Sequence, residues 1–189
     1  MPPDVHRYIN AIWILVGIYW AVTGLRSKPT TRRENNLSRI LHVAVMGLAF
    51  GLLFGSIRSG VLASRFLGNQ VWITWAGLGL VIAGAAVAVW SRTMLGNNWS
   101  GTVTLKHDHE LVRSGPYALV RHPIYSGLLL ALLGTALALG EVRGLLAFAV
   151  AFIAWGVKSA IEERFLVDHF DGAYIRYRSE VKRLIPFVY

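Results

Sequence analysis

HELVRSGPYALVRHPIYSG, residues 109–127, is a polar stretch between two long apolar regions. The Gly-Pro pair at 115–116 is a turn signal. The proline that opens the apolar run 123–139 suits the first position of a helix, so this run predicts a helix. Arg121 and His122 would then lie at a helix N-terminus, where unpaired backbone N–H groups and the helix dipole favour a bound carboxylate or phosphate.

Composition indicates an integral membrane protein. The chain has 189 residues, which predicts one domain, and 54% of them are hydrophobic against 15% charged. It contains no cysteine, which excludes disulfides, thiolate metal ligands and a cysteine nucleophile. A net charge of +9 could suggest a nucleic-acid partner, but the basic residues follow the predicted membrane topology. We therefore expect membrane lipids, and no nucleic acid, as partners.

Five apolar runs are long enough, or nearly so, to cross a hydrocarbon core of about 30 Å. They predict an all-α polytopic membrane protein with five transmembrane helices at 9–25, 40–57, 71–90, 123–139 and 142–157. Only Gly140 and Glu141 separate the last two, which predicts a tight helical hairpin. The final helix should continue out of the bilayer and be followed by a cytosolic C-terminal helix. Arg26 and Lys28 follow the first run without a small-x-small cleavage site, so we interpret it as a helix rather than a signal peptide.

The distribution of Lys and Arg predicts the orientation. Segments 26–39, 91–125 and 158–189 hold 5, 4 and 6 of them, whereas the N-terminus, the 58–70 loop and the hairpin turn hold 1, 2 and 1. By the positive-inside rule the N-terminus is outside and the C-terminus is cytosolic, in the inner membrane if the host is prokaryotic. Residues 109–127 then face the cytosol.

Glycines at regular helical spacing predict close helix packing. Gly77 and Gly84 are seven residues apart, as are Gly127 and Gly134, and a third set lies at Gly47, Gly51 and Gly55. Small residues on one face let helix backbones approach closely in lipid.

The polar stretch and the residues that follow form a recognisable pattern. His-x-Leu-Val, Gly-x-Tyr and Arg-His-Pro-x-Tyr-x-Gly are met at His109, Leu111, Val112, Gly115, Tyr117, Arg121, His122, Pro123, Tyr125 and Gly127. Glu162-Glu163 follow, and then Leu166, Phe170, Tyr174, Tyr177 and Pro186-Phe187. In these residues the chain resembles the isoprenylcysteine carboxyl methyltransferases and the related phospholipid methyltransferases. The resemblance covers roughly the last half of the chain.

The resemblance implies a single membrane-embedded methyltransferase domain over 1–189, with three helices in 1–90 and a cofactor-binding core in 91–189. It implies an enzyme that uses S-adenosylmethionine. The cofactor-binding residues carried over are Thr104, His109, Glu110, Leu111, Val112, Tyr117, His122, Pro123, Ile124, Tyr125 and Glu162. The purely structural alternative is that Tyr117 and Tyr125 anchor the chain at the membrane interface and that His122 caps a helix.

Charged residues after the last apolar run are the candidate catalytic residues. Lys158 and Glu162 are four apart and share a helix face, whereas Glu163 points about 100° away. In the resembled family the position four before the first Glu, usually Arg, holds the substrate carboxylate, and here it is Lys158. Lys supplies a point charge rather than a bidentate fork. Lys158 is thus the candidate for substrate binding and Glu163 for proton acceptance, and the alternative for Lys158 with Glu162 is a surface ion pair.

Methyl transfer needs alignment and a dry site more than strong acid–base catalysis. A carboxylate acceptor requires no base, whereas an amine or thiol must lose a proton, to Glu163, His122 or water. We expect a lipophilic acceptor from the bilayer, with isoprenoid, fatty, phospholipid and small-thiol acceptors all open. The rival interpretations are a membrane-bound NADPH-dependent reductase, a small transporter and a catalytically silent scaffold that has kept the pocket. A metal site at His107 to His109 lacks a convincing third ligand, so no metal is expected.

Overall fold

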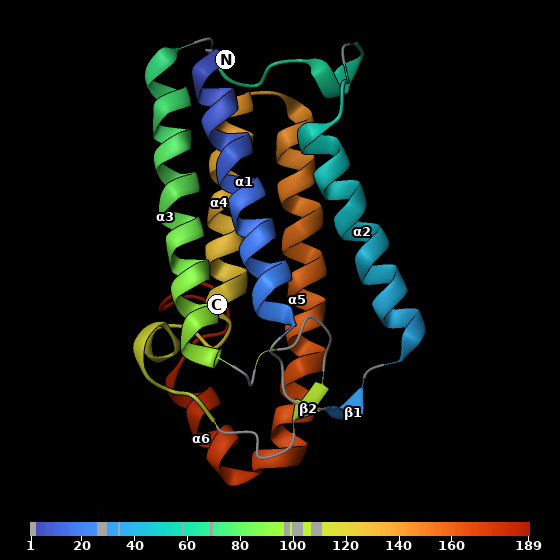
Figure 1. Ribbon diagram of the computed structural model, residues 1–189, viewed down its shortest axis with the longest axis vertical. Coiled ribbons are helices and arrows are strands. Elements are labelled where there is room, and N and C mark those ends of the chain that lie inside the picture. The colour runs from blue at the N-terminus through green and yellow to red at the C-terminus, as the bar shows by residue number, and fades with distance from the viewer. Residues whose placement is uncertain are drawn as a thin grey trace.

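The long helices of the described residues stand side by side in a bundle (Figure 1). The structure is a computed structural model, and it describes residues 3–25, 30–33, 35–57, 59–68, 70–96, 99, 104–106 and 111–189. In chain order the elements are α1 (Pro3–Gly24), β1 (Thr30–Arg33), α2 (Asn36–Phe54), the 3-10 turn η1 (Val61–Ala63), α3 (Val71–Leu95), β2 (Thr104–Lys106), the 3-10 turn η3 (Gly115–Ala118), α4 (Pro123–Leu139), α5 (Val142–Phe170) and α6 (Gly172–Glu180).

The predicted all-α membrane fold is confirmed. Four helices, α1, α2, α3 and α5, are long and apolar enough to cross a membrane, and α4 is a shorter apolar helix of 17 residues. At about 1.5 Å per residue α5 is roughly 44 Å long, which exceeds a hydrocarbon core of about 30 Å. Its polar C-terminal turns, which follow the apolar run ending at Val157, therefore have room to extend beyond that core.

The α4–α5 hairpin forms as predicted, because its turn residues suit their positions. Pro123 occupies the first turn of α4, and the helix ends at Gly140, whose φ of 67° is in the left-handed region that glycine adopts most easily. Glu141 alone separates Gly140 from α5. The Arg65 guanidinium donates to the carbonyl of Leu139, at 3.2 Å, and so satisfies a terminal group of α4.

Two of the three predicted glycine faces are contact surfaces. A Cβ on Gly77 would lie 2.6 Å from the carbonyl oxygen of Gly134, and Gly84 meets Gly127 in the same way, so α3 and α4 pack backbone to backbone. The prediction for α2 is wrong at Gly47 and Gly51, where a Cβ would meet nothing within 4 Å. These two glycines face away from the rest of the bundle because α2 packs on α5 through Ala49, Leu52 and Leu53.

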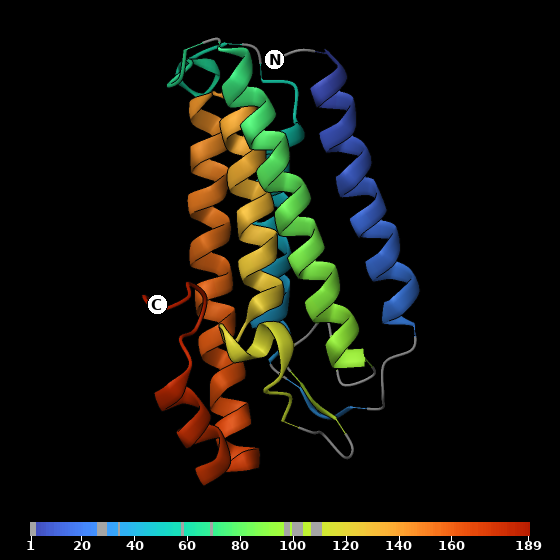
Figure 2. The ribbon, with the colours of Figure 1, turned by 90° about the vertical axis from the view of Figure 1, so that its left-hand side faces the viewer.

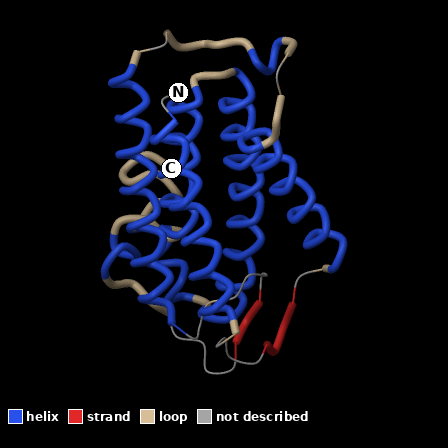
Figure 3. The backbone as a smooth tube through the Cα atoms, turned by 45° about the horizontal axis from the view of Figure 1, so that its top comes forward, coloured by secondary structure: helices blue, strands red, loops and turns tan. Residues whose placement is uncertain are grey.

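The two ends of the bundle differ (Figures 1 and 2). The start of α1, the η1 loop and the α4–α5 turn lie at one end. The strands, η3 and α6 lie at the other (Figure 3). β1 and β2 form an antiparallel pair with Arg33 opposite Thr104, which the sequence did not predict because each strand is only 3 or 4 residues long. The described part of the polar stretch, residues 111–127, and the Glu162-Glu163 pair are therefore at one end, as expected from the alternation of helices.

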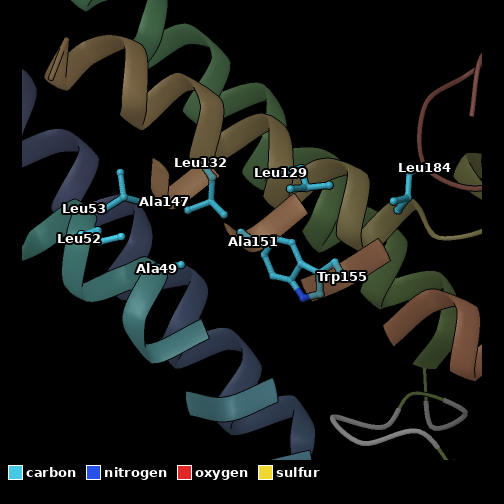
Figure 4. Packing of buried hydrophobic residues seen from close by; sticks show 9 residues of the cluster. All are labelled: Ala49, Leu52, Leu53, Leu129, Leu132, Ala147, Ala151, Trp155 and Leu184. Atoms are coloured by element: carbon cyan, nitrogen blue, oxygen red, sulfur yellow. The ribbon is translucent and has the colours of Figure 1, made fainter. Parts of the chain in front are cut away.

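The main apolar core lies between α2, α4 and α5 and includes the C-terminal segment (Figure 4). Trp155 of α5 and Leu184 are 6% and 2% exposed within it. A second cluster joins Val5 and Ile9 of α1 to α3 and α4. The core ends where the polar side chains of α5 begin, and the candidate site is built on that boundary.

Candidate functional site

Residues 115–123 form the η3 turn and lead from it into the start of α4. Gly115 adopts φ 59°, and the η3 turn that it opens buries Pro116 and Tyr117. His122 then precedes Pro123, and its side chain makes no capping hydrogen bond to α4. His122 thus occupies the N-cap position of α4 through its backbone, while its imidazole is directed to other partners.

The imidazole of His122 lies between two carboxylates of α5. Its Nδ1 is 3.3 Å from Oε2 of Glu162, and its Nε2 is 3.4 Å from Oε1 of Glu163. The second contact is an ion-pair distance without hydrogen-bond alignment. Burial alone would lower the pKa of His122, but the two carboxylates outweigh it and raise that pKa above its ordinary value. The ring is 7% exposed, so this charge is enclosed by protein.

Tyr125 joins α4 to α5. Its hydroxyl donates to Oε1 of Glu162 at 2.6 Å, although the two residues are 37 positions apart. The Tyr125 ring stacks on His122, with centroids 5.7 Å apart, and on Trp155, with centroids 5.8 Å apart. Glu162 is thus held by two donors beside an aromatic stack, while its side chain remains 20% exposed.

Glu163 is more buried and is bound mainly by arginines. Arg121 approaches its Oε1 at 2.7 Å, and Arg183 donates to its Oε2 at 3.0 Å. The Glu163 side chain is 3% exposed and that of Arg121 is 7% exposed. Removing one partner of such a buried ion pair leaves an uncompensated charge, which strongly destabilises a fold.

Lys158 lies one turn before Glu162 and is 9% exposed. Its ammonium is 6.0 Å from the centre of the Tyr125 ring. It also lines a groove of about 460 Å³ between α2 and α5. The other lining residues are mostly apolar, with polar ones toward the start of α2: Asn35, Leu37, Ser38, Leu41, His42, Val45, Ile153, Ala154, Val157 and Ile161.

Tyr117 makes its hydrogen bonds to α3 and α6. Its hydroxyl donates to the carbonyl of Ser91 in α3 at 3.3 Å, and its own carbonyl accepts the hydroxyl of Tyr177 at 2.5 Å. Burial raises the pKa of Tyr177 to about 12 and raises that of Tyr117 further still. Both phenols are therefore neutral donors that tie η3 to α3 and α6.

The structure brings five of the predicted site residues together: Tyr125, Lys158 and His122 with Glu162 and Glu163. Pro123 and Ile124 are buried at the start of α4, and Leu111 and Val112 are half-buried before η3. Thr104 lies in β2. His109 and Glu110, with the considered metal pair at His107 and His109, lie outside the described residues.

Two contributors were missed by sequence reasoning. Trp155 is three and seven residues before Lys158 and Glu162, a spacing that places it on their helix face, so the sequence did contain a signal for it. Arg183 had no comparable local signal, because its contact with Glu163 depends on how the C-terminal segment folds back.

The sequence model of the family described as "Phospholipid methyltransferase" matches residues 72–173, more than half of the chain. The chain belongs to this family. The phospholipid methyltransferase match runs from α3 to the start of α6 and includes the whole hairpin, residues 109–127 and the Glu162-Glu163 pair.

Known proteins support the same kinship. The chain is 31% identical to protein-S-isoprenylcysteine O-methyltransferase of Schizosaccharomyces pombe over 75% of its own length and 62% of that protein. It is 30% identical to protein-S-isoprenylcysteine O-methyltransferase B of Arabidopsis thaliana, over 62% and 61% of the two chains. With the Saccharomyces cerevisiae protein of that name it shares 34% identity, over 58% and 47%. The chain thus spans about half to two thirds of these relatives.

A solved structure shares the fold. The eukaryotic intramembrane Ras methyltransferase ICMT superposes with a TM-score of 0.54 at 24% sequence identity, over 82% of this chain and 54% of that one. The family resemblance and the integral membrane fold expected from the sequence are both confirmed.

Proposed function

We propose that the chain is a membrane methyltransferase that moves a methyl group from S-adenosylmethionine to a lipophilic acceptor. The observation that carries this proposal is the 2.6 Å hydrogen bond between Tyr125 and Glu162. It joins the two motif regions into one cluster, next to a groove that is lined by apolar side chains and by Lys158. Polar groups and an apolar groove that converge are typical of a small-molecule site.

The side chains of this cluster fit this cofactor. A carboxylate that is held in place but still 20% exposed can accept hydrogen bonds from ribose hydroxyls or an amino group. The Tyr125 and Trp155 rings supply aromatic surface beside it. We assign Glu162, Tyr125 and His122 to cofactor binding, with Ile124 and Pro123 shaping the wall. When bound, S-adenosylmethionine supplies an electrophilic methyl group on a cationic sulfur.

The groove between α2 and α5 supports an acceptor with one apolar chain. Its walls are mainly aliphatic, while Lys158 offers an ammonium at the end nearest Tyr125. An acceptor lying there would place its polar head beside Lys158 and its chain along Val45 and Ile153. The names of the relatives favour an isoprenylcysteine-like carboxylate, and isoprenoid or other lipid acceptors fit the same groove. Such carboxylates lose no proton, so the site needs only to align the acceptor and exclude water.

The site faces the cytosol in this proposal. The connections at its end hold most of the Lys and Arg residues, and the cofactor class is water-soluble. The acceptor would enter sideways from the bilayer between α2 and α5.

Calorimetry on the full chain in detergent tests the proposal, with S-adenosylhomocysteine and NADPH as probes. We expect micromolar binding of S-adenosylhomocysteine that is lost in Glu162→Gln and His122→Ala and kept in Glu180→Gln. Glu180 is the matched control, since it is an exposed carboxylate at the same end of the molecule that pairs with Arg113. Preference for NADPH would support a reductase, and binding of neither probe would overturn the proposal.

Labelled methyl transfer into a lipid extract identifies the acceptor. We expect a labelled product in the apolar fraction, and base-labile release of label would indicate a methyl ester on a carboxylate. A product that forms equally well with Lys158→Met would remove the assigned role of the ammonium.

A further inference from the structure

The last nine residues, 181–189, form what we call the C-terminal arm. After α6 the arm folds back along the start of α4 (Figures 1 and 2). The backbone N–H groups of Arg121 and His122 donate to the carbonyls of Lys182 and Arg183, at 2.8 and 3.0 Å. The Ser126 hydroxyl donates to the Leu184 carbonyl at 2.5 Å. The arm thus pairs with the motif stretch directly, backbone to backbone.

The arm is also anchored in the apolar core. Leu184 is 2% exposed and belongs to the cluster that contains Leu129 and Trp155 (Figure 4). Burial of this leucine removes apolar surface from water and so stabilises the attachment of the arm. The backbone position of Arg183, which precedes Leu184, is therefore fixed relative to α4 and α5.

From this fixed position Arg183 reaches Glu163. Its Nη2 is 3.0 Å from Oε2 of Glu163, and its Nε donates to Oε1 at 3.2 Å. Arg121 donates to Oε1 through Nε at 2.8 Å, and the guanidinium of Arg178 lies 3.9 Å from Oε2. The Glu163 carboxylate is thus bound by cations on both oxygens, which makes it a poor proton acceptor.

We propose that Arg183 and Glu163 are positioning residues, which hold His122 and, through it, the cofactor-binding carboxylate of Glu162. The contacts run without a gap from Arg183 to Glu163, His122, Glu162 and Tyr125. This inference rests on the proposed function, in which Glu162 binds the cofactor. It replaces the expectation that Glu163 accepts a proton with a role in orientation.

The geometry of His122 explains why this linkage controls Glu162. The ring presents one nitrogen to each glutamate, so rotation about χ2 would break both contacts at once. A neutral imidazole presents a bare acceptor nitrogen to one of the two carboxylates, which would repel it, whereas the imidazolium presents positive charge and an N–H to both. Glu163 therefore stabilises the charged ring that orients Glu162.

In the described part of the chain, the titratable and charged groups that face this centre come from α4, α5, α6 and the arm. The groups from α5 are Glu162, Glu163 and Lys158. The groups from α4 and the residues just before it are Tyr125 and Arg121. From α6 and the arm come Arg178, Tyr174 and Arg183. Removing Arg183 takes away a cation that competes for Glu163, so the pKa of His122 should rise. Removing the charge of Glu163 should lower that pKa.

The experiment compares Arg183→Gln, Arg183→Lys and Glu163→Gln in the full chain in detergent. The histidine titration is followed by NMR without ligand, with His122→Gln to assign the signal, and S-adenosylhomocysteine affinity is measured across the same pH range. We expect Arg183→Gln to weaken binding about 2- to 30-fold and to move the His122 titration to higher pH. Arg183→Lys should restore part of both, and Glu163→Gln should move the titration to lower pH.

Arg176→Gln is the matched control, because it removes an equal charge from an exposed position on α6. Equal titrations and equal affinities in Arg183→Gln and Arg176→Gln would overturn the proposal, as would a loss of thermal stability without a shift in titration. Glu163→Gln could fail to fold because Arg121 would be left buried without its carboxylate, and then Arg183→Gln alone decides. Failure of the wild-type chain to bind S-adenosylhomocysteine would refute the proposed function, whereas the ligand-free titration still tests the network.

Discussion

The hydroxyl of Tyr125 joins the start of α4 to Glu162 of α5 by a short hydrogen bond. Tyr125→Phe removes only this oxygen and keeps the ring between His122 and Trp155. A hydrogen bond to a charged group contributes roughly 1.5–3 kcal/mol, so we expect S-adenosylhomocysteine affinity to fall about tenfold or more. Calorimetry measures this change, and Tyr8→Phe on the exposed face of α1 is the control. An unchanged affinity would show that Glu162 needs no support from Tyr125.

His122 should make stability depend on pH. Its folded-state pKa is above its ordinary value of about 6.5, so its contribution is fully present below that value and is lost as pH rises through the folded pKa. We expect the melting temperature in detergent to decrease from pH 6.5 toward pH 9, and the decrease to be smaller in His122→Gln. His6→Gln, on α1, serves as control. Stability that increases over this range would contradict a charged His122.

The sequence could predict the residues of the site better than their contacts. The spacing of Lys158 and Glu162 on one face is a helix property, and the motif singled out His122 and Tyr125. The different partners of Glu162 and Glu163 were not predictable in this way. Glu163 is bound to Arg121, which lies just before α4, and to Arg183, which reaches it because the arm folds back; no local pattern encodes the contact with Arg183.

At the scale of elements, the contact between α3 and α4 is made possible by glycine. Gly77→Ala would place its Cβ 2.6 Å from the backbone oxygen of Gly134, so the helices must separate. Gly79→Ala, two residues along α3, meets nothing within 4 Å. We expect Gly77→Ala to cost about 1–3 kcal/mol, by overpacking, and Gly79→Ala to be neutral or slightly stabilising. Thermal unfolding in detergent compares the two, and equal melting temperatures would contradict the close packing.

Helices were predictable and strands were not, for a physical reason. Each of the five apolar runs is long enough to indicate a helix by itself, and the structure has a helix at each. β1 and β2 are separated by about seventy residues and are too short to show a period of two. The glycine faces show a similar limit, since Gly47 and Gly51 have the spacing of a contact but face away from the bundle.

Across the whole molecule, the hairpin determines where the site can form. Because α4 and α5 are antiparallel and joined by a short turn, the start of α4 and the end of α5 must lie at the same end of the bundle. The polar motif occupies the first and the two glutamates occupy the second. The proximity of the motif and the two glutamates therefore follows from topology, whereas the arm supplies Arg183 as a further partner of Glu163.

The same topology makes orientation testable with single cysteines. The native chain has no cysteine, so each introduced thiol is the only one that a maleimide can label. Ser59 lies in the loop between α2 and α3, and Ser179 lies on α6 at the opposite end (Figure 1); both are exposed. We expect a membrane-impermeant maleimide to label Ser59→Cys in intact cells, and Ser179→Cys only after permeabilisation.

The expectation follows from the charges, because most Lys and Arg residues lie in connections at the Ser179 end. Labelling of both variants after permeabilisation is the control for thiol access. Labelling of Ser179→Cys in intact cells, with Ser59→Cys protected, would place the site outside. A cytosolic cofactor could then not reach Glu162, so the same pair of cysteines tests the membrane orientation and the proposed supply of the methyl donor together.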